Sequence, residues 1–217
     1  MNTVTSEFQG AAFPPGTRVS FTTETGSQEG TVQKLLSRCA RVGTEHNGFW
    51  NVPYRALTCT APAAAPAMPL KAVEALGLRL IREHEAASGL KKGWKFAFDL
   101  APVRGGVCRH KQKLIALSVT YCLKASKEEI VDTILHEIAH AIVGPNHNHD
   151  EAWKSVARRI GCTAKRCHQV DHTLPRWRGA CGCGREWKRQ RLSSRTRRGY
   201  CPKCKGRIAW QRGDTAS

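Results

Sequence analysis

The sequence has no run of apolar residues long enough to span a membrane. Its first ten residues, MNTVTSEFQG, also lack the basic-then-apolar pattern of a secretory signal. These two absences exclude a membrane-spanning helix and argue against export. We therefore expect an intracellular protein, cytoplasmic or nucleoid-associated, that is not secreted and has no membrane partner. Hydrophobic residues make up 41% of the chain, so the composition favours folded cores over disorder.

Acidic residues are scarce, with 17 Asp and Glu against 35 Lys and Arg and a formal net charge of +18. The imbalance is concentrated in residues 158–212, which contain 17 of the basic residues and only two acids, Asp171 and Glu186. A basic segment this dense indicates a polyanionic partner. No amphipathic apolar stripe accompanies it, so nucleic acid is favoured over an anionic membrane.

Ten cysteines in a chain without an export signal predict metal ligands or free thiols before disulfides. Cys181 and Cys183 form one close pair, and Cys201 and Cys204 form another, 17 residues further on. Four thiolates close a tetrahedral shell, so the two pairs predict a structural zinc ribbon over residues 178–212. The first pair has one intervening residue where two are usual, which leaves Cys167 or His172 as a substitute ligand.

Seven basic residues lie between the two cysteine pairs, in a segment that we expect to be a β-hairpin. Basic side chains neutralise phosphates, so we expect the ribbon to bind DNA. Trp187 and Tyr200, near the ends of the segment, fit stacking on bases and equally fit the packing of a small ribbon core. The predicted nucleic-acid-binding residues are Arg185, Lys188, Arg189, Arg191, Arg195, Arg197 and Arg198.

The most informative stretch is His136-Glu137-Ile138-Ala139-His140, the pattern HExxH. It lies within residues 126–144, where apolar residues recur at three- and four-residue spacing and Ser126 with Glu129 forms a capping box. Four residues along a helix return to within about 40° of the same direction, roughly 6 Å further along the axis. Both imidazoles can therefore reach one zinc ion, while Glu137 stands beside its open coordination position.

A third ligand for this zinc ion is expected just beyond the helix, in residues 145–151. His149 is preferred because it immediately precedes a second amphipathic helix, which begins at Asp150 and ends near Gly161. His147, in a loop with Asn neighbours, is the first alternative. Glu151 is the second, because a glutamate-ligand site would place its acid on such a helix.

The remaining segments define the domain organisation. Residues 13–60 consist of short segments rich in β-branched and aromatic residues, and the ending WNVPYRAL after GTRVSF resembles SH3-like barrels of the Tudor or KOW kind. Residues 61–68 are an Ala/Pro linker. Residues 69–175 follow as a third unit, with a helix from Leu70 and then two strands, around residues 94–99 and 113–118. The turn-rich segment from Arg104 joins these strands, and a sheet edge beside the HExxH helix can hold an extended substrate.

Residues 69 to 212 resemble the SprT-like (Spartan) family of zinc metalloproteases. The matching pieces are WKFAFD, RGGVCRHKQKLIALS, LHEIAHAIVG, HNHDEAWKSVARRIGC and the cysteine-paired tail. The resemblance implies an α+β, zincin-like protease core in which the HExxH helix packs on a small sheet, between an N-terminal small β-barrel and the C-terminal zinc ribbon. It implies His136, His140 and His149 as ligands of a catalytic zinc, Glu137 as the catalytic acid/base, and proteins attached or crosslinked to DNA as substrates.

The function we predict is a zinc-dependent, DNA-directed metalloprotease with two zinc ions, one catalytic and one structural. Glu137 is expected to assist the attack of a zinc-bound water on a peptide carbonyl. Candidates for a second donor to the oxyanion are His147, Tyr121 and His168. The metzincin branch fits worse, because position 146 is Asn rather than His and the only methionines are Met1 and Met68. The alternatives are a metal-dependent ribonuclease and a non-catalytic, zinc-containing nucleic-acid-binding adaptor.

Overall fold

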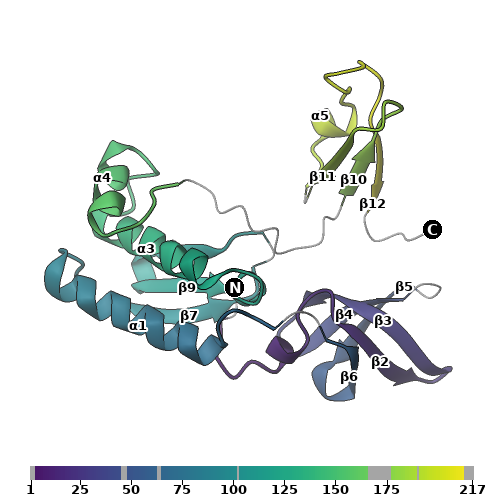
Figure 1. The fold of residues 1–217 in the computed structure, drawn as a ribbon, viewed down its shortest axis with the longest axis horizontal. Helices are drawn as coiled ribbons and strands as arrows, with labels where there is room; N and C mark the ends of the chain where they lie inside the picture. Colours follow the sequence, from purple (N-terminus) through teal and green to yellow (C-terminus); the bar gives the residue numbers. More distant parts are fainter. Residues whose placement is uncertain are drawn as a thin grey trace.

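The computed structural model describes residues 3–44, 48–62, 65–101, 103–165, 177–189 and 191–212. It is a mixed α+β structure with three separate sheets and the helices α1 to α5 (Figure 1). The predicted α+β class is confirmed. The predicted domain bounds stay predictions, and the predicted end of the protease unit at residue 175 lies outside the described residues.

The N-terminal sheet is antiparallel, with the strand order β5-β4-β3-β2-β6. Val19, Phe21, Val32 and Val42 alternate with exposed residues and form its core. The strands predicted here from β-branched and aromatic residues are confirmed, whereas the likeness to an SH3-like barrel stays a prediction. The strands are β2 (Arg18–Thr23), β3 (Gly26–Leu35), β4 (Cys39–Thr44), β5 (Gly48–Pro53) and β6 (Thr58–Ala61).

The first residues of the chain connect this sheet to the next one. Strand β1 (Thr3–Val4) pairs antiparallel with β7 (Lys95–Asp99), and the Ser6 hydroxyl donates to Glu74 at 2.6 Å. The Phe8 ring then packs edge-on against Tyr54, with 5.4 Å between the ring centroids. The N-terminal sheet is therefore attached to the following unit by paired backbone and by packed rings, in addition to the Ala/Pro linker.

The second sheet has the order β1-β7-β9-β8. Strand β9 (Leu114–Ser118) runs parallel to β7, and β8 (Gly106–Arg109) pairs antiparallel with β9. The two strands predicted around residues 94–99 and 113–118 are confirmed. Residues 106–109, expected within a turn-rich connection, form the edge strand that lies against helix α3.

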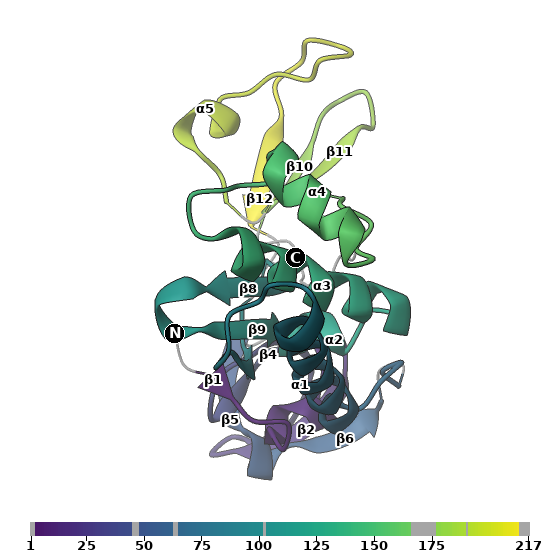
Figure 2. The same cartoon turned by 90° about the vertical axis from the view of Figure 1, so that its left-hand side faces the viewer.

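Helices α1 (Leu70–Ala87) and α3 (Lys127–Val143) contact each other, and Figure 2 shows both on the same side of the second sheet. A Cβ at Gly77 would overlap the Phe96 ring, so a glycine inside α1 lets the helix approach the sheet closely. The capping box predicted at Ser126 is confirmed, and Ile130, Ile134 and Ile138 are fully buried. Two further helices in this unit are α2 (Val119–Cys122) and α4 (Glu151–Arg159).

The C-terminal unit has a three-stranded antiparallel sheet with the order β11-β10-β12 and the short helix α5 (Ser194–Arg197). The hairpin expected between the cysteine pairs was wrong, because β11 pairs with β10, which precedes the first pair. Ser193 accepts a hydrogen bond from the Thr196 N–H and caps α5 in its place. The strands are β10 (Trp177–Ala180), β11 (Glu186–Arg189) and β12 (Ala209–Arg212).

Candidate metal centre and active site

Three histidines from two segments converge on one point. His136 and His140 lie one turn apart on α3, and His149 lies in the turn before α4. The Nε2 atom of His149 is 2.9 Å from Nε2 of His136 and 3.2 Å from Nε2 of His140. Three imidazole nitrogens this close together form a potential metal-binding group.

The backbone around His149 is arranged to deliver its ring to the pair on α3. His149 has a φ of 28°, in the left-handed region that residues other than glycine rarely adopt. The next residue, Asp150, accepts a hydrogen bond from the Trp153 N–H at 3.0 Å and so begins α4. The helix cap and the strained residue before it hold the third imidazole in position.

The two alternative ligands considered from the sequence have other partners. The His147 ring bonds to the Asp150 carboxylate at 2.8 Å, and Glu151 accepts from the Lys154 ammonium at 2.6 Å. His147 contributes through its backbone instead, where its carbonyl accepts a hydrogen bond from the His140 ring. The structure thus groups His149 with His136 and His140, and the His147 carbonyl orients the ring of His140.

Trp153 packs against all three imidazoles. Its ring centroid lies 4.6 Å from that of His136, 4.7 Å from that of His149 and 5.2 Å from that of His140. The side chain is fully buried and comes from the first turns of α4. Trp153 therefore forms one side of the histidine cluster.

The protonation of the cluster suits metal binding. Burial, with smaller contributions from His149 and His110, lowers the pKa of His140 to about 4. His140 is therefore neutral at pH 7, the form in which an imidazole ligates a metal.

Glu137 is held against the edge strand β8. A Cβ at Gly106 would lie 2.8 Å from both Cγ and Oε1 of Glu137, so only glycine allows this approach. The Cys108 backbone N–H donates a hydrogen bond to the Glu137 carboxylate. Burial nevertheless raises the pKa of Glu137 to about 8, against the opposing effects of Arg104 and of that hydrogen bond.

The buried Asp99 binds Arg104, the arginine whose charge opposes the rise in the pKa of Glu137. Asp99 is 1% exposed and accepts from Arg104 at 2.6 Å and from Arg109 at 3.3 Å. From the sequence alone, we assigned no role to Asp99, Arg104 or Arg109. Asp99 ends β7, Arg104 lies in the connection to β8, and Arg109 is the last residue of β8.

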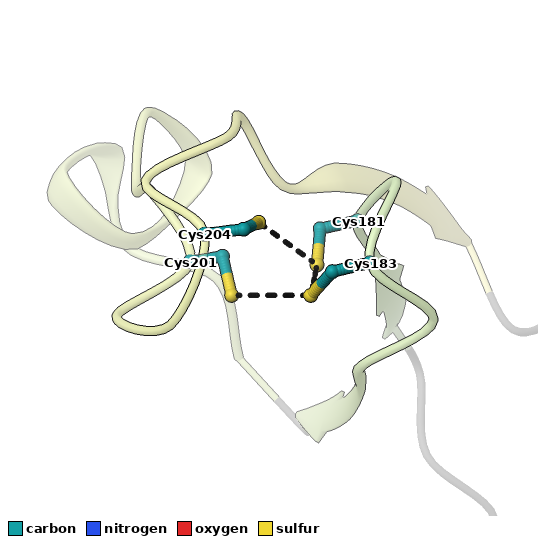
Figure 3. A group of neighbouring side chains, drawn as sticks. All are labelled: Cys181, Cys183, Cys201 and Cys204. Carbon is teal, nitrogen blue, oxygen red and sulfur yellow. Dashed lines mark hydrogen bonds between the residues drawn. The ribbon is translucent and has the colours of Figure 1, made fainter.

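The second donor group consists of the four predicted cysteines, in the turns of the C-terminal unit (Figure 3). Sγ of Cys183 is 3.0 Å from Sγ of Cys181 and 3.7 Å from Sγ of Cys201, and Sγ of Cys204 is 3.8 Å from Sγ of Cys181. A hydrogen bond from the Cys204 backbone N–H helps to lower the pKa of Cys201 to about 6, which favours the thiolate that a metal requires.

Both donor groups fit zinc. A Zn–S bond of about 2.3 Å places the sulfurs of a tetrahedral site about 3.8 Å apart, close to two of the three separations given above. Three imidazole ligands leave a fourth position open, as in catalytic zinc sites. The substitute ligands Cys167 and His172 and the oxyanion candidate His168 lie outside the described residues.

The seven basic residues predicted to contact nucleic acid are all exposed in the C-terminal unit. Arg197 lies over the Trp177 ring, with its guanidinium carbon 5.3 Å from the ring centroid. Tyr200 is 63% exposed, whereas Trp187 is half-buried. The unit therefore presents basic side chains and at least one aromatic ring to solvent, and their contact with DNA stays a prediction.

The fold and the two donor groups are consistent with a metal-dependent hydrolase. Residues 81–173 match the sequence model of the SprT-like family, which supports the family predicted from the motifs. The match includes His136, Glu137, His140 and His149 and leaves the N-terminal sheet and the four cysteines outside. Searches among curated proteins and among solved structures gave no match. Over the described residues, no helix has both the length and the apolar character needed to cross a membrane.

Proposed function

We propose that this chain is a zinc-dependent, DNA-directed metalloprotease that cleaves proteins bound or crosslinked to DNA. The observation that carries the proposal is Glu137, buried and oriented by β8, one residue from a cluster of three imidazoles that fits zinc. The SprT-like domain supports a metallopeptidase. His136, His140 and His149 would hold the catalytic zinc, and Cys181, Cys183, Cys201 and Cys204 would hold the structural one.

A zinc ion at the three histidines would polarise a peptide carbonyl and lower the pKa of water to about 7. Glu137 would accept the proton of the attacking water and then deliver it to the leaving amine. The Cys108 N–H and the close contact with Gly106 hold the carboxylate in place while it does so.

The edge strand β8 offers a place for the substrate. It pairs with β9 on one side and lies beside α3, which carries Glu137. An extended peptide can add to such an edge by main-chain hydrogen bonds, which bind without demanding a particular sequence. This suits an enzyme that acts on varied proteins and takes its selectivity from DNA bound at the basic C-terminal unit.

The test compares the wild type with Glu137→Gln, using a basic protein bound to DNA and, separately, naked RNA. We expect the wild type to cleave the DNA-bound protein and the variant to be inactive while retaining both zinc ions and the fold. Glutamine preserves the size of the side chain and removes its proton acceptor. Cleavage of RNA would instead identify a metal-dependent ribonuclease. Binding of DNA without cleavage of either substrate would identify a non-catalytic adaptor.

A further inference from the structure

Strand β8 contacts helix α3, which carries two of the three clustered histidines. Gly106 lies against Thr133 and Glu137, and the Cys108 N–H reaches Glu137. Successive residues of a strand point to opposite faces, so Gly106 and Cys108 share the face toward α3. His110 follows directly after the strand and begins a short 3-10 helix (His110–Gln112).

His110 is held close to the reacting groups. Its Nε2 lies 3.7 Å from Sγ of Cys108, and the Trp94 ring meets it edge-on, with 5.9 Å between the ring centroids. Burial lowers the pKa of His110, so the neutral ring, which keeps one N–H donor, is favoured. Cys108 thus contacts Glu137 through its backbone N–H and His110 through its sulfur.

A hydrogen-bond donor beside the three histidines would add to the stabilisation that zinc gives the developing oxyanion. The Nε2 atoms of the three clustered histidines face one another, and an ionised Glu137 can only accept. The Tyr121 hydroxyl, considered from the sequence, is buried and bonded to Thr133 at 2.6 Å. Among the described residues, His110 bonds through its ring to a cysteine sulfur, which is a weak partner.

We propose that His110 donates a hydrogen bond to the carbonyl oxygen of the scissile peptide as negative charge develops on it; this inference rests on the proposed function. In that step the water oxygen forms a bond to the carbonyl carbon, and the water proton passes to Glu137. The π electrons of the C=O bond move to the oxygen, which accepts the N–H of His110. His110 keeps its proton, so its role is electrostatic.

The test uses His110→Ala and His110→Gln, with His84→Ala as the control. The His84 ring bonds to the Ser88 hydroxyl at the end of α1 and belongs to neither donor group. Loss of an oxyanion donor typically lowers kcat about 10²- to 10³-fold, and we expect this for His110→Ala with KM changed less than about threefold. His110→Gln should recover part of kcat because its amide can donate, and zinc content should stay at the wild-type value in all variants.

A binding measurement separates this role from structural support. A phosphinic peptide, which mimics the tetrahedral centre, should bind His110→Ala more weakly by a factor similar to the loss in kcat, while a product peptide should bind as it does to the wild type. A kcat within about threefold of the wild type overturns the proposal, as does loss of zinc in both variants. If even the wild type fails to cleave, the proposed function fails and the analogue affinities decide the role of His110. No analogue binding to the wild type overturns both.

Discussion

The two donor groups of this protein are built in opposite ways. The histidine group stands on a capped helix in which Ile130, Ile134 and Ile138 are fully buried, and the ring of Trp153 packs against all three imidazoles. The cysteine group lies in turns between four-residue strands, and Cys201 is the one buried hydrophobic side chain among the described residues from 177 onward. The comparison indicates that the fold creates the first site, whereas the metal creates much of the fold around the second.

Removing ligands from each site should therefore have unequal consequences. Structural zinc sites in small peptides contribute about 10–16 kcal/mol to folding, so Cys201→Ser with Cys204→Ser should unfold the C-terminal unit. His140→Ala should lose its metal while α1 and α3 stay folded. Elemental analysis should give about two zinc equivalents for the wild type and one for each variant, with circular dichroism reporting the helices. A wild type with one equivalent would contradict the assignment of one of the two sites.

The next largest effect concerns the charge of the C-terminal unit. Reversing Arg195, Arg197 and Arg198 to Glu should weaken DNA binding and reduce DNA-stimulated proteolysis together. If three phosphate contacts are lost, the slope of log K against log salt should fall by roughly two to three units. Cleavage of a small unstructured peptide should change little, because the histidine group is untouched.

A matched reversal in the N-terminal sheet provides the control. Lys34, Arg38 and Arg41 are also exposed bases and carry the same total charge. Their reversal to Glu should leave the salt dependence close to that of the wild type. The opposite result, with the larger effect in the N-terminal sheet, would identify that sheet as the nucleic-acid-binding unit.

A smaller loss is expected from Gly106→Ala. The added methyl would meet Glu137 at 2.8 Å and displace the carboxylate without touching a metal ligand. A displacement of about 1 Å can cost about 10²-fold in rate, so we expect kcat to fall between about 10- and 100-fold with zinc content unchanged. Gly182→Ala is the control, because a Cβ there has no heavy atom within 4 Å. Equal kcat values for the two variants would show that the β8 contact does not position Glu137.

Much of the histidine site could be predicted because its information is local. The HExxH spacing, the capping box at Ser126 and the position of His149 before a helix all act within a few turns of one another. The four cysteines were predictable for the same reason, since each pair is formed within a single turn. Spacing also predicted the principal strands and the helix that begins at Leu70.

The parts that were missed depend on how the strands pair and on what each strand then contacts. Residues 106–109 look like a turn because two glycines open the segment, yet pairing with β9 makes them a strand and brings Cys108 and His110 to α3. Asp99 binds Arg104 and Arg109, and the spacing of the three residues alone does not indicate these bonds. The pairing of β1 with β7 joins residues almost a hundred positions apart, and no local pattern in the first residues indicates it.

The smallest effects are expected from two tryptophans, Trp153 beside the histidine group and Trp210 in the C-terminal unit. Trp153 Nε1 is buried and has no hydrogen-bond partner in the described part of the chain, whereas Trp210 Nε1 donates to the Thr196 carbonyl at 3.1 Å. Trp153→Phe leaves a cavity and also removes an unsatisfied donor, whose burial costs about 1–3 kcal/mol. We therefore expect its free energy of unfolding to change by less than about 1 kcal/mol, and its zinc affinity by less than about tenfold.

Trp210→Phe loses a hydrogen bond and gains nothing in return, so it should destabilise the C-terminal unit by about 0.5–1.5 kcal/mol in addition to its lost packing. Urea unfolding of the zinc-loaded protein, followed separately for the two units, measures both changes. Trp153→Ala fixes the scale, because truncation of a fully buried tryptophan costs about 3–5 kcal/mol. If Trp153→Phe costs nearly as much as Trp153→Ala, the indole nitrogen is essential to the histidine site. The site would then depend on a specific polar contact, and its contrast with the metal-dependent cysteine site would be weaker than the buried core suggests.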